Sequence, residues 1–170
     1  MYNYKIVEQV KRKRKPLAGV LSKIMVIFGV IFVLMGIMIS QAFMLAGFLL
    51  VLLYFAFDVF SNKEYEYTLE DNKLEIDVIY GKRYRKNAHV IDLQEMEVTA
   101  PNWHESVAKY KKNGGTEKLP KYDYTSYEED TPYYTMIAIE DRQKIKLLLD
   151  LSDEMLQTIK RSYPSKVFFA

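Results

Sequence analysis

The fold of this chain is decided by residues 17–60, which read LAGVLSKIMVIFGVIFVLMGIMISQAFMLAGFLLVLLYFAFDVF. Lys23 and Asp58 are the charged side chains of this stretch, and its apolar pattern is interrupted at Ser40-Gln41. As one straight helix the stretch would measure about 66 Å at the usual rise per residue, whereas the hydrocarbon core of a bilayer is about 30 Å thick. We therefore expect a transmembrane helical hairpin with spans at residues 17–39 and 42–60.

Five consecutive cations precede the first expected span and predict its orientation: Lys11, Arg12, Lys13, Arg14 and Lys15. Residues 1–23 carry a net charge of +6, and positive charge beside a span resists translocation. We therefore expect a multi-pass protein of the cell membrane with both termini in the cytoplasm. A nucleic-acid partner is not expected, because the basic run adjoins a membrane span. A cleaved signal peptide fits poorly, because the apolar run is too long and a second span follows it.

Charge and periodicity divide the chain into three parts. These are a basic cytoplasmic N-terminal segment at residues 1–16, the two-span hairpin at 17–60 and a cytoplasmic domain at 61–170. The last part carries a net charge of −3 and is long enough for one small core. The chain has no cysteine, which excludes disulfide frameworks and thiolate metal sites.

Small residues recur every seven positions in the first expected span, at Ser22, Gly29 and Gly36. They lie near one face of a helix and would allow a neighbouring helix to approach closely. We favour packing against the second span of the same chain, with homodimerisation through this face as the alternative. No charged residue lies at mid-membrane depth in either span, which disfavours a transporter or a channel.

Beyond residue 60, apolar and polar residues alternate as they do in half-buried strands. The alternation predicts strands near residues 64–70, 74–80, 83–93 and 96–99, joined in series by tight turns. Residues 101–132 lose the pattern, and we expect an irregular insert there, with a short edge strand near residues 121–126 and a mobile loop in the remainder. Strands near residues 133–139 and 144–149 form a final hairpin.

An amphipathic helix closes the domain. Ser152 is a suitable N-cap, Asp153 and Glu154 suit the first turn, and Pro164 ends the helix. The expected fold class is therefore α+β. A transmembrane helical hairpin is followed by an antiparallel β meander or barrel of six or seven strands, capped by a C-terminal α-helix.

This succession of elements resembles the bacterial pleckstrin-homology-like (PH-like) membrane proteins with a two-helix anchor. The matching segments are residues 64–101, from Glu-Tyr-Glu-Tyr-Thr-Leu through Ile-Tyr-Gly-Lys-Arg to Ala-Pro, and residues 133–167. Val7-Glu8 and the basic run are also similar to the start of small two-span proteins of Gram-positive anaerobes. The resemblance implies a PH-like fold and a scaffolding, envelope-associated or regulatory role, and it supplies no catalytic residue.

The sequence carries no pattern that indicates catalysis or metal binding. His89 lies in a strand-like run and His104 at the start of the insert, and these are the only two histidines. A metal site needs three or four converging ligands, and no His, Asp or Glu spacing resembles one. Glycine-rich phosphate loops and nucleophile elbows are also absent from the sequence. We expect a protein that is not an enzyme and that uses no cofactor.

A basic cluster marks the turn between the second and third expected strands. It comprises Lys82, Arg83, Arg85 and Lys86, together with Lys73 at the start of the second strand. Guanidinium and ammonium groups bind phosphate oxygens, and a short linker keeps the domain close to the bilayer. The cluster is therefore a candidate site for anionic lipid headgroups. The alternative is a basic turn that is exposed to solvent and has no ligand.

Aromatic residues crowd the insert, and Trp103, Tyr122, Tyr124 and Tyr127 form a candidate partner-binding loop. Aromatic side chains with a polar group favour interfaces, although they also serve as strand and core residues. The predicted function is a non-enzymatic, membrane-anchored PH-like module that makes protein or headgroup contacts at the cytoplasmic face of the bilayer. The alternative is a structural or accessory subunit whose hairpin packs into a larger membrane complex.

Overall fold

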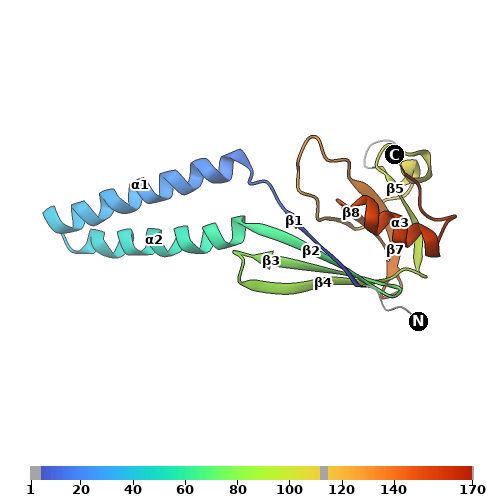
Figure 1. The fold of residues 1–170 in the computed structure, drawn as a ribbon. Coiled ribbons are helices and arrows are strands. Elements are labelled where there is room, and N and C mark those ends of the chain that lie inside the picture. Colours follow the sequence, from blue (N-terminus) through green and yellow to red (C-terminus); the bar gives the residue numbers. More distant parts are fainter. Residues whose placement is uncertain (1–4, 112–114, 170) are drawn as a thin grey trace. The chain divides into compact units, whose positions relative to one another are not determined.

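The structure, a computed structural model, describes residues 5–111 and 115–169 (Figure 1). Contacts between residues divide the chain into two compact units. The helical unit comprises Lys13–Lys63 and Ile79–Arg85, and the strand unit comprises the described residues outside these two ranges. A short piece of the strand region, Ile79–Arg85, thus belongs with the helices.

The helical unit is built on two long apolar helices, α1 (Pro16–Met38) and α2 (Ala42–Ser61), as the hydropathy pattern predicts. Only 11% of the most apolar 18 residues of α1 and 6% of the most apolar 18 residues of α2 are buried. A core helix of a soluble protein would bury most of such a surface. The exposed apolar faces therefore suggest membrane association.

Glycines allow the two helices to pack closely against each other. A Cβ atom at Gly36 would lie 2.1 Å from the Cγ atom of Met44 and 2.8 Å from its backbone nitrogen. A Cβ atom at Gly47 would lie 3.1 Å from the backbone nitrogen of Val33, and one at Gly29 would meet Val51 at 3.5 Å. The small-residue face of α1 thus packs against α2 of the same chain.

The first sheet has the strand order β1-β2-β3-β4. Its strands are β1 (Lys5–Lys11), β2 (Lys63–Glu70), β3 (Lys73–Tyr80) and β4 (Tyr84–Asp92). β1 pairs antiparallel with β2 over its whole length, from Lys5 opposite Glu70 to Lys11 opposite Glu64. The sequence pattern predicts no strand in residues 1–16, so β1 is an additional element. The helical hairpin is inserted between β1 and β2 in the chain.

The second sheet has the strand order β5-β7-β8-β6. Its strands are β5 (Met96–Pro101), β6 (Lys121–Asp123), β7 (Tyr134–Glu140) and β8 (Gln143–Leu149). β5 and β8 pair antiparallel with β7, whereas β6 lies parallel to β8. The described residues therefore form eight strands in two sheets, which confirms the α+β class with one strand more than the upper end of the expected range.

A C-terminal helix, α3 (Asp153–Ser162), follows the second sheet. It begins where the sequence predicts, because the Ser152 side chain accepts a hydrogen bond from the backbone N–H of Met155 at 3.2 Å. Its apolar face, which includes Leu156 and Ile159, is almost fully buried. The largest fully buried side chains elsewhere in the strand unit come from both sheets and from the turn after β4, which holds Leu93: Tyr67, Leu69, Leu74, Ile76, Ile91, Leu93, Met96, Met136, Ile137, Leu147 and Leu149.

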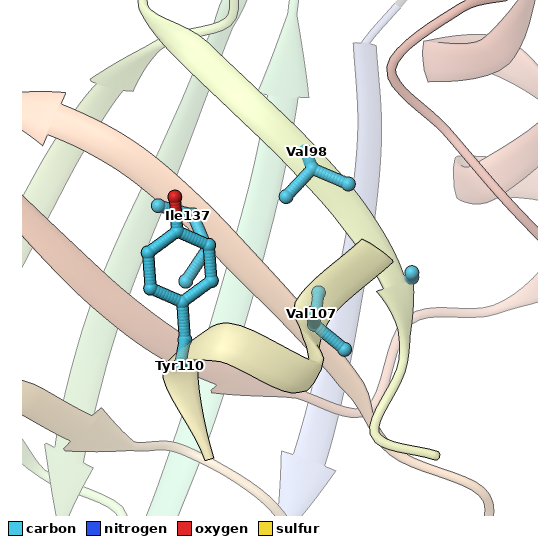
Figure 2. Packing of buried hydrophobic residues seen from close by; sticks show 5 residues of the cluster. Val98, Val107, Tyr110 and Ile137 are labelled. Atoms are coloured by element: carbon cyan, nitrogen blue, oxygen red, sulfur yellow. The ribbon is translucent and has the colours of Figure 1, made fainter. Parts of the chain in front are cut away.

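Part of the segment at residues 101–132 is more ordered than its irregular pattern predicts. A short 3-10 helix, η1 (Glu105–Tyr110), places Val107 and Tyr110 against Val98 and Ile137 of the second sheet (Figure 2). Tyr110 and Val107 are each at most 3% exposed. Residues 112–114 of the insert lie outside the described residues. η1 thus forms a short helix that covers the sheet, within a segment where the sequence pattern indicated no regular structure.

A polar network fixes η1 at its outer edge. The carboxylate of Glu97 on β5 accepts hydrogen bonds from the Tyr110 hydroxyl at 2.6 Å and from Lys109 Nζ at 3.3 Å. Lys144 Nζ on β8 lies 2.7 Å from the same carboxylate. Partial burial disfavours the ionised form of Glu97, but the bonds from Lys144, Tyr110 and Lys109 outweigh it and lower the pKa of Glu97 to about 2.

Candidate membrane-interface site

The ends of α1 and α2 meet in a polar network within the helical unit. Arg14, just before α1, donates from Nη2 to Asp58 Oδ1 of α2 at 2.6 Å, and its Nε donates to Asn62 Oδ1. Asn62 Nδ2 donates in turn to Asp58 Oδ2 at 3.3 Å. The start of α1 and the end of α2 lie at the same end of the hairpin. The network neutralises the negative charge of Asp58 there.

The turn between β3 and β4 is held against this end of α2. The backbone N–H of Gly81 donates to the carbonyl of Asn62 at 2.9 Å, and the ring of Tyr80 packs edge-on against Phe60 with centroids 5.9 Å apart. Gly81 has a φ of +55°, and a Cβ atom there would lie 3.1 Å from Val59 Cγ1. Glycine is therefore required at this position by both its conformation and its close contact with the helix.

Cations of the helical unit adjoin this end of the hairpin along the chain. Six of them, which we call the basic collar, are Lys13, Lys15, Lys63, Lys82, Arg83 and Arg85. Lys82, Arg83 and Arg85 are exposed, whereas Lys63 places its Nζ 5.4 Å from the centre of the Tyr80 ring. Tyr84, 61% exposed, adds an aromatic side chain beside them. The site thus combines positive charge with aromatic rings at the end of two apolar helices.

The structure brings together only part of the predicted headgroup cluster. Lys82, Arg83 and Arg85 belong to the helical unit, whereas Lys86 belongs to the strand unit. Lys73 begins β3, and the turn follows the last residue of that strand, so about 24 Å of extended chain separates Lys73 from the turn. Lys73 is therefore not part of the collar.

Lys63, Tyr80 and Tyr84 belong to the site, although the sequence reasoning did not select them. The equal lengths of β2 and β3 indicate that these three residues lie near the end of α2. β2 begins directly after α2, and β2 and β3 both have eight residues, so β3 ends where β2 starts. An antiparallel pair of equal strands returns the chain to the helix end.

The basic run Lys11–Lys15 does not act as one block of free charge. Arg14 is engaged at Asp58, as described above, and Arg12 belongs to the strand unit, where its Nη2 lies 3.0 Å from Asp123 Oδ1. Lys11, Lys13 and Lys15 are exposed. Three of the five cations are therefore available to solvent or to a membrane surface.

The predicted partner loop is divided between the surface and the core of the strand unit. Trp103, Tyr122 and Tyr127 are 58%, 39% and 43% exposed, whereas Tyr124 is only 9% exposed. Tyr124 packs edge-on against Tyr65, with ring centroids 5.2 Å apart, and also contacts the ring of His89. Tyr124 is therefore a core residue and not available to a partner.

Both histidines have structural partners. His89 is 7% exposed, and its Nδ1 lies 2.5 Å from Glu140 Oε2. His104 caps η1, because its Nδ1 accepts a hydrogen bond from the backbone N–H of Ser106 at 3.2 Å, and its ring stacks on Phe168. Within residues 5–111 and 115–169, no group of three or more His, Asp or Glu side chains is arranged to hold a metal ion.

Comparison with known protein families assigns the chain to a family. The family model described as Bacterial PH-like domain (DUF6106) matches residues 5–169. The match starts in β1 and ends beyond α3, so it includes the helical hairpin as well as both sheets. No curated protein and no solved structure matches the chain.

Proposed function

The chain belongs to the bacterial PH-like domain family, and we propose that it is a non-enzymatic module. Its hairpin anchors it in a membrane, and its basic collar contacts anionic lipid headgroups. The observation that carries this proposal is the position of the β3–β4 turn, which Gly81 and Tyr80 hold at the end of α2. The 20 residues of α2 match the thickness of the hydrocarbon core, so the turn lies at headgroup depth when the hairpin spans a bilayer.

Electrostatics favour this contact. Each Lys or Arg close to an anionic leaflet contributes on the order of 1 kcal/mol, so exposed collar cations such as Lys13, Lys15, Lys82 and Arg83 together contribute several kcal/mol at low salt. Asp58 does not oppose them, because Arg14 neutralises it. Tyr80 and Tyr84 are the type of side chain that is enriched at the boundary between hydrocarbon and water.

The same charges set the proposed orientation. Positive residues flank the start of α1 and the end of α2, so this end stays in the cytoplasm and the turn at residues 39–41 reaches the outer face. Lys23 lies two turns into α1, and its long side chain extends to the cytoplasmic interface. Both chain ends and the strand unit are then cytoplasmic.

The alternatives raised by the sequence have less support. Gly29 and Gly36 are already covered by α2, so we do not propose a homodimer through Ser22, Gly29 and Gly36. An accessory subunit would pack its outer helix faces against other helices, and such faces are rich in small residues. The exposed faces of α1 and α2 instead carry large side chains such as Phe28, Leu34 and Phe48, which suit contact with lipid chains.

Spin-labelled lipids test the headgroup contact on the full-length protein in bilayers. The fraction of motionally restricted phosphatidylglycerol is compared with that of phosphatidylcholine. We expect the wild type to prefer phosphatidylglycerol several-fold and the variant Lys82→Gln/Arg83→Gln/Arg85→Gln to lose most of this preference.

The matched control is Lys73→Gln/Lys118→Gln/Arg161→Gln, which removes three exposed cations outside the helical unit. It should keep the preference of the wild type. Equal selectivity in all three proteins, or none in the wild type, would rule out the collar as a headgroup site.

A further inference from the structure

A second surface feature, independent of the collar, lies wholly within the strand unit. A cleft of about 580 Å³, a volume typical of ligand pockets, is lined by the segment at residues 123–133, by Trp103 and Lys121, and by Leu148 of β8 with Asp150 after it. We call it the acidic cleft. Its aromatic lining comes from Trp103, Tyr127 and Tyr133, and Leu148 lies among them.

The acidic cleft has a strong excess of negative charge. Its acidic lining consists of Asp123, Glu128, Glu129, Asp130 and Asp150, and Lys121 is the basic residue among the lining side chains. Lys121 Nζ lies 3.7 Å from Asp123 Oδ2, and no described residue forms an ion pair with the three consecutive acids at 128–130. Burial and the nearby Asp123 carboxylate both raise the pKa of Tyr133, as expected at negative potential.

The wall of the cleft already binds one cation, which comes from the chain itself. The guanidinium of Arg12 lies over the Tyr127 ring, 4.2 Å from its centre, and 4.9 Å from the centre of the Tyr65 ring. Its Nη2 donates to the Asp123 carbonyl at 2.6 Å and to the Asp123 carboxylate at 3.0 Å, and its Nε donates to the Thr125 carbonyl at 3.2 Å. Asp123, Thr125 and Tyr127 all line the cleft.

The remaining lining offers the same chemistry without a cation. Trp103 and Tyr133 supply aromatic faces, and the acids at residues 128–130 supply carboxylates, as Tyr127 and Asp123 do for Arg12. Rings and carboxylates together are the groups that bind guanidinium and ammonium side chains. An anionic headgroup or a nucleic acid would be repelled from the same lining.

We propose that the acidic cleft docks a lysine- or arginine-bearing segment of a partner protein, with a cationic side chain between Trp103 and the acids at residues 128–130. Charge complementarity and the Arg12 contact carry this assignment. A bare divalent cation fits less well, because the described His, Asp and Glu side chains form no group arranged to hold a metal. The contact needs neither the basic collar nor a lipid bilayer.

Tryptophan fluorescence provides a direct test, because Trp103 is the only tryptophan in the chain and is 58% exposed. A hexa-arginine peptide is titrated against the full chain in a neutral detergent, which carries no charge to attract the peptide. We expect a saturable change in emission. The variant Glu128→Gln/Glu129→Gln/Asp130→Asn should weaken binding at least tenfold.

The control variant removes three exposed acids of the strand unit that lie outside the cleft: Asp71→Asn/Glu75→Gln/Glu95→Gln. It should bind hexa-arginine within twofold of the wild type, and far-UV circular dichroism should show that both variants are folded. The proposal is overturned if the emission does not change, if hexaglutamate binds as well as hexa-arginine, or if the control loses as much affinity as the cleft variant. Because the detergent contains no anionic lipid, failure here would leave the headgroup proposal intact.

Discussion

Replacement of Gly36 by alanine tests how the hairpin is held together. The added Cβ atom would lie 2.8 Å from the backbone nitrogen of Met44, about 0.6 Å closer than the 3.4 Å at which ordinary contacts begin. The Met44 side chain can rotate away, but the backbone of α2 has to move. Overpacking of this kind costs about 1–3 kcal/mol.

Gly19→Ala is the matched control, because a Cβ atom at Gly19 meets nothing within 4 Å. Both substitutions gain about 1 kcal/mol of helix propensity, so the difference between them isolates the packing cost. We expect Gly36→Ala to be less stable than Gly19→Ala by about 2 kcal/mol, which is roughly a 30-fold change in the unfolding equilibrium constant.

The absence of cysteine from the chain allows a clean assay. Dyes attached at Lys15→Cys and Ser61→Cys report the separation of the two helix ends by energy transfer during titration with sodium dodecyl sulfate. If Gly36→Ala and Gly19→Ala unfolded at the same detergent fraction, Gly36 would not lie at a close helix crossing and the packing described here would be incorrect.

Substitutions at three further positions test the strand unit. The lowered pKa of Glu97 means that its ionised form stabilises the folded state above about pH 4.5, and that this contribution is lost as the pH falls towards 2. In Glu97→Gln, the melting temperature should therefore fall less steeply with pH over this range than in the wild type. Tyr67→Phe removes a buried hydroxyl that donates to the Tyr124 carbonyl at 2.7 Å, so denaturant unfolding should show a loss of about 1–2 kcal/mol, whereas an unchanged midpoint would contradict the bond. Ser152→Ala should cost about 1 kcal/mol by the same measurement, because it removes the N-cap of α3, and Ser152→Thr, which keeps the hydroxyl that also donates to Glu8 Oε1, should restore most of it.

Local patterns were sufficient to predict most elements of this fold. Alternation of apolar and polar residues identified β2, β3, β4, β5, β7 and β8, and hydropathy identified α1 and α2, because these signals depend on neighbouring residues. α3 was predicted from its N-cap and apolar face. The PH-like fold followed from the order of these elements.

The elements that the sequence did not predict depend on distant contacts. β1 is rich in charged residues and becomes a strand by pairing with β2, which lies more than 50 residues away in the chain. η1 is short, and Val107 and Tyr110 fix it against the second sheet. Neither element carries enough periodicity of its own to be recognised.

The candidate sites divide in the same way. The basic turn was identified from composition, but its position beside α2 depends on the matched lengths of β2 and β3. Tyr124 and Tyr127 look equivalent in the sequence, yet the first is buried against Tyr65 and the second is exposed. The Arg12 contact joins residues more than 100 positions apart, which no local pattern reveals.

We propose that the hairpin crosses the membrane twice and leaves both chain ends in the cytoplasm. Single cysteines at Gln41, in the turn between the helices, and at Ser165, beyond α3, test it with a membrane-impermeant maleimide on intact cells. We expect Gln41→Cys to react at once and Ser165→Cys to react only after the cells are permeabilised. Labelling of Ser165→Cys on intact cells, or recovery of the chain in the soluble fraction, would contradict the account.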